Sequence, residues 1–117
     1  MPTAAILACL TRVEAFFRRH DNPNADWISD LLARHAGDRD GFWKAVNSTR
    51  FWGGAGSIAN EALGDNPGIP ALEWQMEIRA LREDLIEIAA EIQDHGDSHP
   101  DIQSWLLAFH NWNNAGQ

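Results

Sequence analysis

The densest group of residues suited to binding chemistry is a glycine-rich turn near the middle of the chain. Three glycines fall within four positions, after two aromatic residues and before a serine. Glycine permits positive φ and close backbone approach, and the N–H groups at a helix N-terminus can bind an anion. Residues 50–61 are therefore a candidate site for a small ligand. Its members are Arg50, Trp52, Gly53, Gly54, Gly56, Ser57 and Glu61.

The spacing of these glycines does not match a known phosphate-binding motif. No lysine follows Gly56 and no predicted strand precedes the turn, so neither the Walker pattern nor the dinucleotide-binding pattern fits. The favoured interpretation is a structural turn that lets Phe51 and Trp52 pack under neighbouring helices. Ser57 then caps a short helix, and Glu61 lies in its first turn. The ligand-site alternative instead places Trp52 partly exposed beside Arg50, because it lies outside the long predicted helices.

A row of carboxylates follows one flank of the longest predicted helix. Its members are three, four or seven residues apart: Glu73, Glu77, Asp84, Glu87 and Glu91. Like charges at i, i+4 repel, at a cost of about 0.2–0.5 kcal/mol per pair. Tolerance of this cost along the helix favours a contact surface for a basic protein partner, and a solvated face is the near-equal alternative.

The histidines and the single cysteine give weaker indications of chemistry. His95 and His99 have the i, i+4 spacing of metal ligands, but Gly96 and Ser98 are expected to break the helix between them. Cys9 falls on the apolar side of the first predicted helix, where thiols are usually unreactive. No Glu-x-x-His motif of the di-iron bundles occurs. We therefore predict no metal, no cofactor and no catalytic residue, and we favour a non-enzymatic role.

Hydrophobic periodicity predicts an all-α fold. Apolar residues recur at three- and four-residue spacing, and no segment alternates as a half-buried strand does. The main predicted helices cover residues 3–20, 25–36 (capped by Asn24), 38–47, 70–95 and a final segment that is capped by Ser98 and frays over 113–117. Residues 64–68 read as a loop. We expect residues 1–117 to form one domain, a compact helical bundle of four or five main helices.

The predicted helix over 70–95 is the spine of this bundle. Its apolar residues keep a 4-3-4-3-4 spacing, namely Trp74, Ile78, Leu81, Leu85, Ile88 and Ile92. Such a spacing is typical of the seam of a helix packed lengthwise against others. Pro70 suits its first turn, and Gly96 is expected to end it.

Charge is distributed unevenly along the chain. Residues 1–52 hold seven Lys/Arg and six Asp/Glu, whereas residues 53–117 hold two Arg and eleven acids, for a net charge of −8. This balance opposes binding to nucleic acid and to anionic lipid. One cysteine precludes an internal disulfide, no basic leader is seen, and no apolar run approaches the ~20 residues that span a bilayer. We expect a cytoplasmic protein that does not associate with membranes.

The segment Phe51-Trp52-Gly53-Gly54-Ala55-Gly56-Ser57-Ile58-Ala59-Asn60 resembles the Gly-Gly-x-Gly-Ser-hydrophobic signature of small uncharacterised bacterial helical proteins. Some of those proteins are suspected immunity proteins of toxin systems. The resemblance covers about a tenth of the chain, and it implies a helical partner-binding protein without an assigned catalytic residue. Those proteins usually have Met at the place of Ala55.

Two hypotheses follow. The first is a small acidic protein that acts by protein–protein interaction, as an immunity-type or regulatory partner. The second is an enzyme or ligand-binding bundle with a pocket at residues 50–61. A closed glycine turn packed on tryptophan favours the first, and an open pocket with convergent polar groups favours the second.

Overall fold

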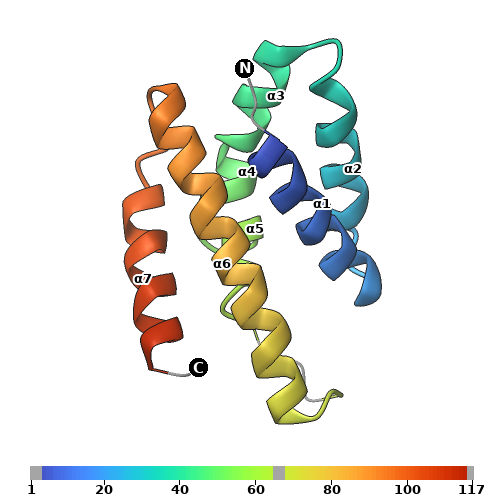
Figure 1. The fold of residues 1–117 in the computed structure, drawn as a ribbon, viewed down its shortest axis with the longest axis vertical. Helices are drawn as coiled ribbons and strands as arrows, with labels where there is room; N and C mark the ends of the chain where they lie inside the picture. The colour runs from blue at the N-terminus through green and yellow to red at the C-terminus, as the bar shows by residue number, and fades with distance from the viewer. Residues whose placement is uncertain (1–3, 65–67, 116–117) are drawn as a thin grey trace.

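The computed structural model describes residues 4–64 and 68–115, and within these ranges the chain is helical with no strand (Figure 1). Five helices have eight or more residues and two consist of a single turn. They are α1 (Ala4–Arg19), α2 (Asn24–Arg34), α3 (Arg39–Val46), α4 (Thr49–Trp52), α5 (Ile58–Glu61), α6 (Ala71–His95) and α7 (Ile102–Asn114). The predicted all-α bundle with a long helix in its C-terminal half is confirmed. The predicted helix start at Thr3, most of the loop over 64–68 and the last two residues lie outside the described residues.

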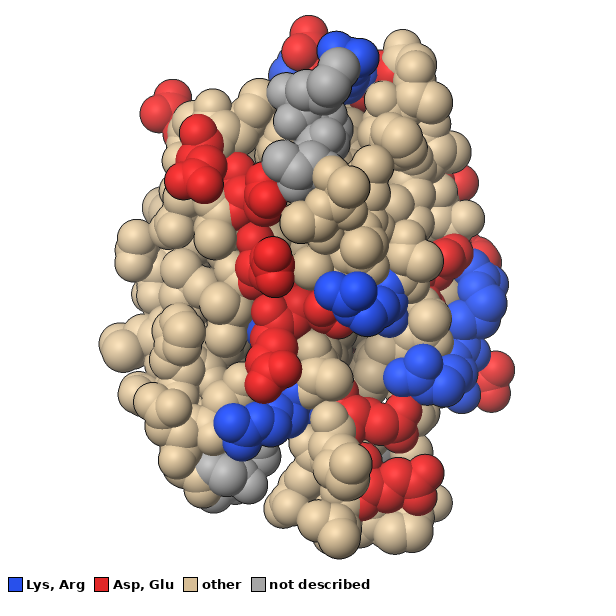
Figure 2. Space-filling model, in the orientation of Figure 1, with Lys and Arg blue, Asp and Glu red and all other residues tan. Residues whose placement is uncertain are grey.

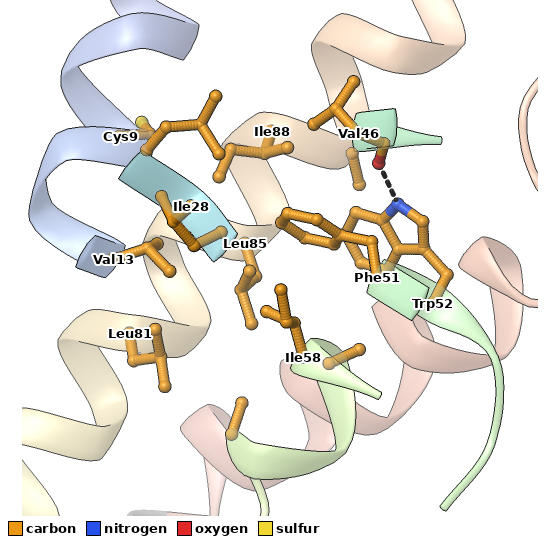
Figure 3. Packing of buried hydrophobic residues seen from close by; sticks show 14 of the residues in the cluster. Cys9, Val13, Ile28, Val46, Phe51, Trp52, Ile58, Leu81, Leu85 and Ile88 are labelled. Atoms are coloured by element: carbon orange, nitrogen blue, oxygen red, sulfur yellow. Dashed lines mark hydrogen bonds between the residues drawn. The ribbon is translucent and has the colours of Figure 1, made fainter. Parts of the chain in front are cut away.

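Helix α6 crosses the molecule diagonally between its neighbours. It packs against α1 on one side and against α7 on the other, and α1 in turn packs on α2 (Figure 1). The single-turn helices α4 and α5 contact each other. In Figure 3, side chains from α1, α2, α4 and α5 converge on Leu81, Leu85 and Ile88 of α6. The core is therefore assembled around α6.

The buried face of α6 is the one that its periodicity predicts. Ile78, Leu81, Leu85, Ile88 and Ile92 are buried, and Trp74 is half-buried at the start of the helix. The helix ends as expected, because the N–H of Gly96 still bonds to the carbonyl of Ile92 and the chain then turns away. The α1 stripe is also confirmed, with Ile6, Leu10, Val13 and Phe17 all in the core.

Several helix ends differ from the prediction. Asn24 is the first residue of α2 rather than its cap, and its own N–H bonds to the side chain of Asn22. Ser98 does not cap the last helix, which begins only at Ile102. Asn113 is buried within α7 instead of frayed, because its side chain accepts a hydrogen bond from a buried arginine. The residues at which these helices begin and end depend on local capping and on side-chain contacts between helices. The spacing of apolar residues does not predict such boundaries.

None of the described helices is long and apolar enough to cross a membrane.

The position of Leu85 at the centre of the core gives a direct test of this packing. Leu85→Ala should lower the free energy of unfolding by about 2–5 kcal/mol, because it removes a fully buried side chain and leaves a cavity. Denaturant or thermal melts would measure the change. Leu107→Ala on the exposed side of α7 is the matched control and should melt like the parent. Equal melting of Leu85→Ala and the parent would contradict the packing described here.

Candidate functional site

The glycine turn, residues 53–56, has a defined backbone. Gly53 ends α4, and its N–H bonds to the Thr49 carbonyl at 2.7 Å. A methyl group on Gly53 would overlap the Thr49 side chain and lie 2.8 Å from the same carbonyl oxygen. Gly54 and Gly56 adopt φ values of 36° and 85°, a region that residues with a Cβ rarely enter. The glycines are therefore required by the shape of the turn itself.

Trp52 is fully buried under this turn, as the structural interpretation of the turn predicted, and the alternative of a partly exposed ring is wrong. Its indole Nε1 donates a hydrogen bond to the Val46 carbonyl at 2.8 Å (Figure 3). Its own carbonyl accepts a hydrogen bond from the indole Nε1 of Trp105. The residue thus ties α4 to the end of α3 and to α7, and its ring has no exposed face for a ligand.

The other polar residues of the predicted ligand site make contacts in different parts of the fold. Ser57 is buried and caps α5 by accepting a hydrogen bond from the Asn60 N–H, as predicted. Arg50 is directed towards α2, where it donates to Asn24 Oδ1 at 2.9 Å and lies 5.3 Å from the centre of the Trp27 ring. Glu61 is half-buried at the end of α5.

A hollow of about 210 Å³ lies between α2 and the segment from α3 to α4. Its walls are Trp27, Asp30, Leu31, Arg34, Ala45 and Ser48. None of the seven residues proposed from sequence lines this hollow. The structure therefore does not gather those seven residues around one cavity.

The predicted acidic row divides into members with an internal counterion and members on the open surface. Glu77 lies 3.0 Å from Arg19 and 3.4 Å from the imidazole of His20, and Asp84 lies 2.9 Å from Arg12. Arg12 and Arg19 belong to α1, and His20 follows directly after it. The carboxylates of Glu77 and Asp84 are largely shielded from solvent. The repulsion within the row is therefore relieved by α1 at these two positions, which sequence reasoning did not anticipate. The remaining members, Glu73, Glu87 and Glu91, lie at exposed or half-buried positions.

A buried arginine that sequence reasoning missed joins α6 to α7. Arg82 is 1% exposed; its Nε donates to Asn113 Oδ1 at 2.7 Å and its Nη1 to the Ala62 carbonyl at 3.1 Å. The guanidinium also lies 5.5 Å from the centre of the Trp112 ring. Burial lowers the pKa of Arg82, and the neighbouring charge of Arg79 lowers it further. The signal in the sequence was a charged residue directly after Leu81, inside the apolar face of the helix.

Arg82 also lines a cleft of about 250 Å³ at the end of the molecule where α6 begins and α7 ends. The cleft is walled by Leu63, Gly64, Trp74, Gln75, Ile78 and Trp112. At this end, Figure 2 shows the surface notched between two lobes. The walls are mostly apolar, and the arginine on its floor already bonds to protein carbonyl groups.

The histidines at the other end of α6 are engaged separately. The His95 ring stacks on Trp43 at 3.8 Å with the two planes 7° apart. His99 lies 3.3 Å from the Thr49 hydroxyl through Nε2, and its Nδ1 accepts the N–H of Asp101. Their contacts hold the turn after α6 against α3 and α4, and the two rings are not directed at a common point.

Cys9 is buried in α1 beside Arg12, whose guanidinium donates to its sulfur at 3.3 Å. Burial raises the pKa of the thiol to about 11, and the nearby Asp84 carboxylate adds to this effect. Because the thiolate is the nucleophile, this environment opposes reactivity.

Comparison of the chain with protein-family models, curated proteins and solved structures finds no significant match. The function must therefore be inferred from the residues and their arrangement.

The backbone of the glycine turn can be tested by adding one methyl group at a time. Gly53→Ala and Gly56→Ala should each lower the free energy of unfolding by about 1 kcal/mol or more, the first through overlap with Thr49 and the second through its positive φ. Gly37→Ala is the control, because nothing lies within 4 Å of the added Cβ and its φ is not positive. Thermal melts of the three variants make the comparison. A flexible turn would instead leave all three midpoints equal.

The environment of Cys9 predicts slow chemical labelling. A thiol pKa of about 11 in place of 9.0 lowers the thiolate fraction near pH 8 by about a hundredfold, and burial slows access further. A thiol-reactive dye should therefore label the native protein at least that much more slowly than the protein unfolded in guanidinium. Equal rates in the two states would show that α1 does not bury this side chain.

Proposed function

We propose that this protein acts by binding a basic protein partner through the acidic end of α6. We call this surface the acidic ridge; it comprises Asp84, Glu87, Glu91, Asp94 and Asp97. The observation that carries the proposal is the local excess of acidic residues in this part of the sequence. Residues 83–117 contain seven acids and no Lys or Arg.

The arrangement of charge on the surface supports this choice. In Figure 2, acidic side chains follow α6 over most of its length, and basic side chains lie beside its middle and lower parts. Arg12 pairs with Asp84 at the lower end of the ridge, and the arginines further along α1 lie beyond it, near Glu77 and Glu14. Glu87 and Asp94 are exposed. A concentrated field of one sign accelerates encounter with an oppositely charged partner and disfavours wrong partners.

The alternative, a ligand-binding bundle with its site at residues 50–61, has less support. Small-molecule sites are usually concave and bring a few polar groups together. The turn is instead closed over a buried Trp52, and Arg50 is directed away towards α2. These features favour a structural role for the turn and a surface role for the molecule.

An immunity-type role is the specific form of this proposal that the resemblance of the glycine segment suggests. A small acidic protein of this kind neutralises a toxin by covering a basic surface, and it needs no catalytic residue of its own. The long acidic helix on a rigid core is suited to that task.

The proposal is tested by reversing charge on the ridge. Glu87→Lys/Asp94→Lys should slow association with a partner several-fold, because both positions are exposed and lie outside the buried seam. Tagged parent and variant proteins would be used to capture partners from the source cell at low and high salt. Binding kinetics with the captured protein would then be measured.

The matched control is Asp30→Lys/Asp40→Lys, which makes the same change in net charge on α2 and α3. This control should retain the partner that the ridge variant loses. A partner captured equally by all three proteins, at both salt concentrations, would contradict the proposal. Thermal melts of each variant confirm that the fold is intact.

A further inference from the structure

The outward side of α6 carries a second regular stripe, opposite the buried seam. We call it the outer stripe; its members, spaced 4-3-4-3-4, are Leu72, Met76, Arg79, Glu83, Ile86 and Ala90. This is the spacing at which two helices pack along a common seam. Leu72 and Met76 are 72% and 68% exposed, the two most exposed large apolar side chains among the described residues. Ala90 is also exposed, and Ile86 is half-buried.

We propose that two copies of this chain associate through the outer stripe, with their α6 helices antiparallel. The reason is that the stripe is complementary to itself when one copy is turned end for end about a point near residue 81. Leu72 then faces Ala90 of the second copy, and Met76 faces its Ile86. Arg79 faces Glu83 of the second copy, and the two-fold symmetry makes each of these three contacts occur twice.

The central charges favour this antiparallel arrangement. Within one chain, Arg79 Nε lies 3.5 Å from Glu83 Oε1, and both side chains remain about half exposed or more. Two such pairs brought together antiparallel alternate in sign and form a ring of four charges. A parallel pairing would instead place arginine against arginine and glutamate against glutamate.

The distribution of charge along the whole of α6 also favours the antiparallel arrangement. Residues 71–82 hold two acids and two arginines, whereas residues 83–95 hold five acids and no Lys or Arg. An antiparallel pair places the neutral half of each helix against the acidic half of the other. A parallel pair would place the two acidic halves together, which charge repulsion disfavours.

The contact has a plausible extent for a modest dimer. Leu72 and Ala90 are 18 residues apart on one continuous helix, so the stripe is about 27 Å long. The acids that face α1, including Glu77 and Asp84, lie on the other flank of α6 and stay outside it. This inference is independent of the basic partner proposed above.

Sedimentation of the purified full chain over a wide concentration range tests the association. The parent should show a reversible equilibrium between monomer and dimer. Met76→Glu should weaken association about tenfold or more, because it places a charge in an apolar contact. Leu107→Glu is the matched control: it makes a comparable change at an exposed apolar residue on α7 and should leave the equilibrium unchanged.

A charge exchange tests the centre of the stripe. Arg79→Glu and Glu83→Arg should each weaken association, since each sets like charges against each other across the axis. The double variant Arg79→Glu/Glu83→Arg should restore association, because the alternation of sign returns. Arg79 also donates to the Asn113 carbonyl at 2.9 Å, so melts of each variant separate a loss of fold from a loss of pairing.

Cross-linking tests the direction of the two helices. Leu72→Cys and Ala90→Cys proteins should form a disulfide-linked dimer when mixed, and neither should do so efficiently alone. Cys9 is 1% exposed and leaves little background. A monomer at every concentration, a dimer indifferent to Met76→Glu, or efficient cross-linking of either variant alone would each overturn the proposal.

Discussion

The structure depends on the burial of Trp52 between the end of α3 and α7. An indole ring that is removed from water needs a partner for its N–H, and the last carbonyl of α3 supplies it. The backbone carbonyl of Trp52 accepts a hydrogen bond from the indole of Trp105 in α7. Together with its neighbour Phe51, Trp52 therefore joins the first three helices to the C-terminal pair. The glycines that follow let the chain turn immediately after this buried anchor.

The two sides of α6 are used differently. Towards α1, its acids are matched by arginines, so a potential source of repulsion instead holds α1 and α6 together. Towards α7, the buried Arg82 is bonded to a side-chain oxygen and a carbonyl, and this holds the last turn of α7 in place. Buried polar groups are costly unless bonded, so the bonds of Arg82 fix α7 on α6, whereas the arginines paired with α6 from α1 are exposed and their ion pairs contribute less.

The two proposed contact surfaces are the parts of α6 that these internal contacts leave accessible. The acidic end of α6 lies beyond the reach of most of the α1 arginines, and the outer stripe faces solvent. Both surfaces belong to one rigid helix, which suits recognition without rearrangement. The proposed partners would therefore meet a preformed surface, which the interior of the protein holds in shape.

Much of the fold was readable from the sequence. Apolar residues at helical spacing identified α1, α2, α3, α6 and the buried seam with Leu85 at its centre, because one face of each helix must be buried. The sequence also located the glycine turn and the Ser57 cap, which depend on local chemistry. It could not show that the Trp52 carbonyl accepts a hydrogen bond from Trp105, that Arg12 and Arg19 neutralise part of the acidic row, or that Arg82 bonds to Asn113. Those contacts join residues 31 to 72 positions apart, or depend on such packing, and only the tertiary structure decides which distant side chains meet.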